Sequence, residues 1–194
     1  MSYLSQKKLN KYGILTVSFI VLIISGCIFA PSHKITTFDL GTPKSIAPAK
    51  IKLAVMPFMN DTEAAFQMLY RTGKNQVEKD TYNRWVEAPG LLITSYLLDA
   101  FSSSENKDSF TGADDYILSG NVTLFEINLP NKYVVLRVNY RIMHNNRYLI
   151  EKDVTLKQAF DKSSPDNFAK AMSKAAGDLA NEIKSQVMKV SVIK

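Results

Sequence analysis

The chain has 194 residues, of which 24 are lysine or arginine and 18 are aspartate or glutamate, so its formal net charge is +6. Three of the lysines and none of the acids lie in the first 26 residues, which leaves 21 basic and 18 acidic side chains in the rest. That near balance gives nucleic-acid binding no support, while the remaining length suffices for one domain with a sizeable core. The single cysteine excludes an internal disulfide.

The first 26 residues have the three parts of a secretory signal peptide. Lys7, Lys8 and Lys11 precede an uncharged run from Gly13 to Ile24, and small residues follow it. A transmembrane helix needs roughly 20 apolar residues, which this run does not reach. A signal peptide over residues 1–26 is therefore favoured over a membrane-spanning anchor helix.

The stretch "ISGC", which ends at Cys27, resembles the bacterial lipobox. That resemblance implies cleavage before Cys27, a thioether from its sulfur to diacylglycerol, and N-acylation of the new terminus. Each buried methylene adds about 0.8 kcal/mol, so several acyl chains would hold the protein on a membrane. Ile28 resembles the residue found there in lipoproteins sorted to the outer membrane. The alternative is that Cys27 is a free thiol.

After Cys27 the composition predicts a tether followed by a folded domain. Residues 27–50 are expected to be the lipidated N-terminus and tether, with one short strand over Ile35–Leu40. The domain is expected over 51–194, beginning with an alternating strand in which Ile51, Leu53 and Val55 face one side and which Pro57 closes. Two strands flanking Gly73 and a helix that starts near Pro89 come next.

The second half of the domain predicts three long strands and a helix. The strands are expected over 115–129, 133–144 and 148–160, and the helix over 163–189. In the middle strand, apolar side chains alternate with Arg137 and Arg141, as in an antiparallel sheet with one wet face. That wet face is either simply solvated or an interface with an acidic partner. The predicted fold class is α+β: a mostly antiparallel sheet with two main helices packed on one face.

No motif for catalysis, metal binding or phosphate binding occurs in the sequence. His33 and His144 each lack a carboxylate or second histidine at metal-ligand spacing. Asp114 and Asp115 are adjacent acids of the kind that are usually solvated. We therefore predict that the protein is not an enzyme and holds no cofactor or metal.

The most distinctive stretch runs from Leu69 to Leu98 and contains "LYR", "YNRW" and a proline before an apolar helix. It resembles the ABC-type transport auxiliary lipoproteins, the family of paraquat-inducible protein C. The residues that carry the match are Tyr70, Arg71, Tyr82, Arg84, Trp85 and Pro89. Family members often carry aromatic residues where this chain has Glu78 to Asp80. The simpler expectation for Tyr82 and Trp85 is burial in the core, because they end a strand beside a helix.

The resemblance implies an auxiliary lipoprotein on the periplasmic face of the outer membrane. It would act as a docking or assembly component for an MCE-domain protein in a periplasm-spanning ABC lipid-transport system, and it would form a homo-oligomer. Two alternatives remain open from the residues. One is a periplasmic lipid- or small-ligand-binding chaperone or carrier, and the other is an outer-membrane assembly lipoprotein.

Overall fold

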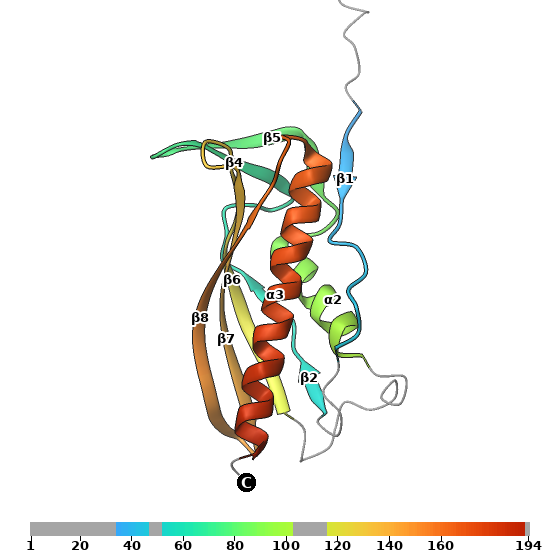
Figure 1. Cartoon of the computed structure of the whole chain (residues 1–194), viewed down its shortest axis with the longest axis vertical. Helices are drawn as coiled ribbons and strands as arrows, with labels where there is room; N and C mark the ends of the chain where they lie inside the picture. Colours follow the sequence, from blue (N-terminus) through green and yellow to red (C-terminus); the bar gives the residue numbers. More distant parts are fainter. Residues whose placement is uncertain (1–33, 47–51, 103–115, 193–194) are drawn as a thin grey trace, which may run out of the picture. The chain divides into compact units, whose positions relative to one another are not determined.

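A computed structural model describes residues 34–46, 52–102 and 116–192 (Figure 1). The strands and helices in chain order are β1 (Thr36–Phe38), β2 (Leu53–Val55), β3 (Met59–Asn60), β4 (Gln67–Gly73), β5 (Gln76–Trp85), α2 (Pro89–Phe101), β6 (Tyr116–Asn128), β7 (Tyr133–His144), β8 (Arg147–Ala159) and α3 (Pro165–Val192). The signal peptide, Cys27 and the adjacent acids Asp114 and Asp115 lie outside the described residues, and what the sequence indicates about them stays a prediction.

The strands form one mixed sheet of eight, in the order β1-β5-β4-β6-β7-β8, with β2 and β3 also paired to β6. The long strands β6, β7 and β8 are antiparallel neighbours, as are β4 and β5. Along one edge, β6 pairs in parallel first with β2, then with β3 and then with β4. The predicted fold class, a mostly antiparallel α+β fold, is confirmed.

The alternation along β7 places its apolar side chains in the core, as predicted. The side chains of Val134, Leu136, Val138, Tyr140 and Ile142 are fully buried, while Arg137 and Arg141 are exposed. Asn145 and Asn146 have φ values of 49° and 57°, which suit the two-residue turn between β7 and β8. The apolar stripe of α3 meets the buried face of this sheet, and α2 lies beside α3 (Figure 1).

The helix α2 begins at Pro89 and packs its first turn against the backbone at Phe58 and Met59. A Cβ atom at Gly90 would lie 2.6 Å from the Phe58 carbonyl oxygen, so only glycine allows this approach. Thr94 Oγ1 accepts a hydrogen bond from the Phe58 N–H at 2.8 Å and donates one to the Gly90 carbonyl at 2.8 Å. These contacts hold the helix that follows the "YNRW" stretch in place.

The alternating strand that the sequence predicts from Ile51, closed by Pro57, is β2, and the separate short strand β3 follows the proline, which lacks an N–H to donate. The short strand expected over Ile35–Leu40 is present as β1, which pairs with β5. Beyond it Leu40 is buried, and the Ile46 N–H donates to the Ala100 carbonyl at 2.7 Å.

Candidate functional site

The six family-motif residues of the described chain lie on the β4–β5 hairpin and at the start of α2. The register pairs Gln67 with Arg84 and Leu69 with Lys79, so β5 residues 80–83 stand opposite Met68 alone. This β-bulge, with four residues of β5 opposite one residue of β4, makes β5 bend in the middle of the motif. On its other edge, the end of β5 pairs with β1. The hairpin is therefore an irregular element that needs side chains to fix its shape.

Asp80 organises the bulge by accepting four hydrogen bonds. Its Oδ1 accepts from the backbone N–H groups of Tyr82 at 2.8 Å and Asn83 at 2.9 Å. Its Oδ2 accepts from the Tyr70 hydroxyl at 2.7 Å and from Asn83 Nδ2 at 2.8 Å. Burial by itself raises the pKa of Asp80, but the hydrogen bonds outweigh it and lower the pKa below its ordinary value. The ionised carboxylate is thus part of the folded hairpin.

Tyr70 connects this bulge to helix α3. Its hydroxyl donates to Asp80, and its ring meets that of Phe168 edge-on, with centroids 5.7 Å apart and planes at 63°. Burial raises the pKa of Tyr70, and the hydrogen bond to Asp80 raises it further. Tyr70 therefore stays a neutral donor at any physiological pH, and the bulge is held to the helix.

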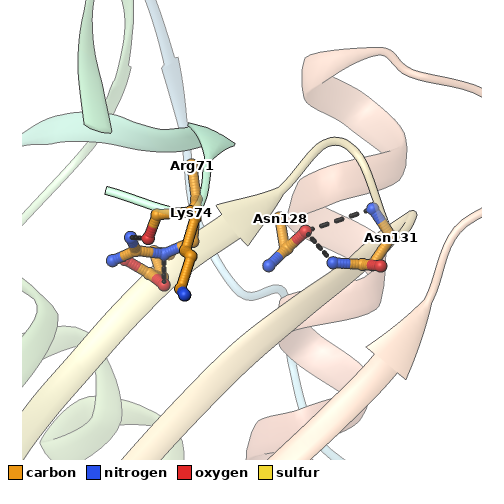
Figure 2. Close-up of polar contacts among 5 residues, drawn as sticks. Arg71, Lys74, Asn128 and Asn131 are labelled. Carbon is orange, nitrogen blue, oxygen red and sulfur yellow. Dashed lines mark hydrogen bonds and ion pairs between the residues drawn. The ribbon is translucent and has the colours of Figure 1, made fainter. Parts of the chain in front are cut away.

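Arg71 and Glu126 fasten the hairpin to the central strand β6. Arg71 donates from Nε to Glu126 Oε1 at 2.6 Å and from Nη2 to Oε2 at 2.9 Å, a bidentate pair. The Glu126 side chain is 6% exposed and that of Arg71 28%. The hydrogen bond to Glu126 raises the pKa of Arg71, so the guanidinium stays charged. Figure 2 shows Arg71 also donating to the carbonyl oxygen of Lys74, at 3.3 Å, beyond β4.

A second polar contact closes the turn after β6. Asn128 Oδ1 accepts from the backbone N–H of Asn131 at 3.1 Å and from its Nδ2 at 2.9 Å (Figure 2). The Leu129 N–H donates to the Arg71 carbonyl at 3.1 Å, which joins this turn to β4. The hairpin, the β6–β7 turn and the buried ion pair thus form one connected unit.

The remaining motif residues have separate roles. Trp85 is buried in the core as predicted, with its ring centroid 5.0 Å from that of Phe125. Pro89 is buried at the first turn of α2, where its fixed φ suits a helix start. Arg84 is half-buried and donates from Nε to the Thr81 carbonyl at 3.3 Å. The expectation that Tyr82 is buried is wrong: it is 43% exposed, because it stands three residues before Trp85 and so lies on the opposite face of β5.

Asp80 accepts hydrogen bonds from the Tyr70 hydroxyl and from the Tyr82 backbone N–H, which brings these two motif residues together. The two motif arginines lie apart. Arg71 lies opposite Val77 and Arg84 opposite Gln67, at different ends of the hairpin. Sequence reasoning missed Asp80 and Glu126. Asp80 precedes Tyr82 and Asn83 at the spacing of an Asx turn, and Glu126 is a lone acid in an apolar strand, so both carried a local signal.

Within the described ranges, no three histidine, cysteine, aspartate or glutamate side chains gather closely enough to hold a metal ion. None of the helices that the structure describes combines the length and apolar character needed to span a membrane.

The braced hairpin and two-helix mixed sheet define a small α+β domain, and its relatives show which family it represents. The family model described as "ABC-type transport auxiliary lipoprotein component" matches residues 59–184, and the chain belongs to that family. The matched range contains all six motif residues as well as Asp80 and Glu126. The protein is therefore a member of a family of lipoproteins that serve as auxiliary components of ABC-type transport.

Solved structures share this fold at low sequence identity. A protein of Xanthomonas campestris has 15% identity and a TM-score of 0.65, over 80% of this chain and 99% of its own. An uncharacterized protein has 16% identity and a TM-score of 0.65, over 79% of this chain and 99% of its own. No curated protein matches the chain.

Proposed function

We propose that this chain is the outer-membrane-anchored auxiliary lipoprotein of an MCE/ABC lipid-transport system. It acts on the periplasmic face as a docking or assembly component for the MCE-domain protein, and it works as a homo-oligomer. The observation that carries the proposal is the family match over residues 59–184. The lipobox-like "ISGC" supports the anchored location.

In this proposal the N-terminal segments are processed as the sequence predicts. Residues 1–26 direct export and are removed, Cys27 receives the acyl chains, and Ile28 permits sorting to the outer membrane. The domain itself has no catalytic role and needs no cofactor. Its task is to present a defined surface to a protein partner while the lipid holds it at the bilayer.

The braced hairpin supports a docking role. A docking surface must keep its shape before the partner arrives, since ordering it on binding would lower the affinity. Here Tyr70, Arg71 and Asp80 fix the hairpin against α3 and β6 through buried or half-buried contacts. These motif residues therefore serve the partner by positioning the hairpin, and the exposed side chains near its tip, from Gln76 to Lys79, supply the contacts.

The packing of α3 favours docking over the alternative of a lipid carrier. A carrier of this architecture would hold an acyl chain between α3 and the sheet. That interface is occupied by α3 side chains that are fully buried: Met172, Ala175, Ala176, Leu179, Ile183 and Val187. They face the fully buried side chains of β7, so an acyl chain would have to displace core residues.

Two measurements on the native complex test the proposal. After crosslinking in cells, purification of the tagged chain should recover an MCE-domain protein, and recovery of none would contradict docking. Native mass spectrometry of the purified chain should show a homo-oligomer whose only lipid is the covalent one. A stoichiometric, non-covalent lipid would favour the carrier instead.

A further inference from the structure

Two exposed apolar side chains stand next to each other where β1 meets β5. The register pairs Thr36 with Asn83 in parallel, which places Ile35 beside Tyr82 on the neighbouring strand. Ile35 is 49% exposed and Tyr82 43%. Phe38 and Trp85, at the alternate positions, belong to the core, so Ile35 and Tyr82 lie on the opposite, outer face.

Basic side chains lie at the same end of the domain as this pair. Half-buried Arg84 follows Tyr82 on the same face of β5. A hollow of about 310 Å³ between the end of β8 and the start of α3 is lined in part by Lys162, Lys170 and Lys174, with Asp161 its one acidic lining residue. Figure 1 shows the start of α3 and the start of β1 at the same end of the domain. This end therefore combines apolar, aromatic and basic groups.

The chain length from the predicted anchor restricts where this end can lie. Ile35 is eight residues after Cys27, and eight residues span at most about 26–29 Å even when fully extended. As a flexible chain they would span roughly 14–17 Å. Ile35 directly precedes β1, which is part of the sheet, so this limit on distance also limits how far the folded domain can lie from the anchor. Acyl chains on Cys27 would therefore hold Ile35 near the bilayer surface.

We propose that the outer face around Ile35 and Tyr82 is a membrane-contact surface that lies on an anionic phospholipid bilayer. The proposal rests on the lipid anchor of the proposed function. Tyr82 would sit at the headgroup level, where tyrosine rings are enriched, and Ile35 would reach the acyl boundary. Arg84 and the lysines beside α3 would meet the anionic headgroups. The contact orients the domain, since two apolar side chains bind weakly unless an anchor keeps them close.

Cysteine alkylation on vesicles tests the proposal in the full, lipidated protein. Cys27 is the single cysteine, and acylation converts it to a thioether, so an introduced cysteine is the only free thiol. We would prepare Tyr82→Cys and, as a matched control, Tyr148→Cys. Tyr148 is 65% exposed at the β7–β8 turn, at the other end of the long strands. The probe is a membrane-impermeant maleimide, and the vesicles contain phosphatidylethanolamine and phosphatidylglycerol.

The proposal predicts that a cysteine at residue 82 is alkylated several-fold more slowly in the lipidated protein on vesicles than in the Cys27→Ser form in detergent-free solution. A cysteine at residue 148 should be alkylated at the same rate in both samples. Ile35→Cys should behave like Tyr82→Cys, which guards against a local effect of one substitution. Equal rates at 82 and 148 in protein that carries the acyl mass and floats with the vesicles would overturn the contact surface alone. A native chain without acyl mass that does not float would overturn the anchor, and the contact surface with it.

Discussion

Removing the positive partner of Glu126 should destabilise the domain far more than removing a surface ion pair. In an Arg71→Met variant, a carboxylate that is 6% exposed would lose its bidentate partner. Breaking a buried pair on one side costs about 3–5 kcal/mol, and because Arg71 is 28% exposed, water reduces this penalty. We expect a loss of about 2–4 kcal/mol in the free energy of unfolding.

The double variant Arg71→Met, Glu126→Leu separates an unpaired charge from a lost attraction. Replacing both partners by apolar residues of similar size is often close to neutral. The double variant should therefore recover most of the stability that the single variant loses. Glu126→Gln should lie between them, because its amide oxygen still accepts a hydrogen bond while the charge is gone.

Urea unfolding followed by tryptophan fluorescence is a suitable assay, since Trp85 is the sole tryptophan and is 1% exposed on the same hairpin. Arg141→Met is the matched control. Arg141 pairs with Glu151 at 2.8 Å, but both side chains are about half exposed. Such a surface pair contributes roughly 0–1 kcal/mol. Equal losses for Arg71→Met and Arg141→Met, or a double variant as unstable as the sum of its single changes, would refute the reasoning.

Three further changes test the parts of the fold that hold the hairpin and α2, each by urea unfolding. Asp80→Asn should lower stability at neutral pH, and the gap to the parent should shrink in acid. In the folded protein the pKa of Asp80 lies below its ordinary value of about 3.9. The stability that the ionised carboxylate contributes is therefore complete above that ordinary value and declines as the pH falls through the folded pKa. A stability difference between the parent and Asp80→Asn that is constant with pH contradicts this. Gly90→Ala should cost about 1–3 kcal/mol because its Cβ would lie 2.6 Å from the Phe58 carbonyl oxygen. Gly177→Ala, which meets only the Tyr96 hydroxyl at 3.2 Å, should be nearly neutral, and similar losses at both glycines would count against the close approach. Thr94→Val should cost about 1–3 kcal/mol by leaving the buried Phe58 N–H without its acceptor, and an unchanged midpoint would mean that another group accepts it.

The elements that the sequence predicts well are those whose burial repeats locally. The apolar positions of β7 recur every second residue, and the stripe of α3 from Phe168 to Val187 recurs at helical spacing. Both patterns follow from one element facing one core. The wet face of β7, including Arg137 and Arg141, follows from the same alternation and is exposed as expected.

The features that escaped prediction depend on partners far away in the chain. Arg71 and Glu126 are 55 residues apart, and no local pattern indicates that β4 pairs in parallel with the end of β6. Tyr82 is exposed because residues three apart in a strand point to opposite faces, so Tyr82 and the buried Trp85 do not share the core face. The family motif drew attention to the right hairpin, but the side chains that brace it include two that the motif does not contain.

Membrane fractionation of the partner tests the central claim most directly. Cells would carry the chain, a Cys27→Ser variant or no chain, and the MCE-domain protein would be followed through a density gradient. The account predicts that this protein is recovered with the outer membrane only when the chain with Cys27 is present. Equal recovery with the outer membrane in all three strains would contradict a lipid-anchored docking role.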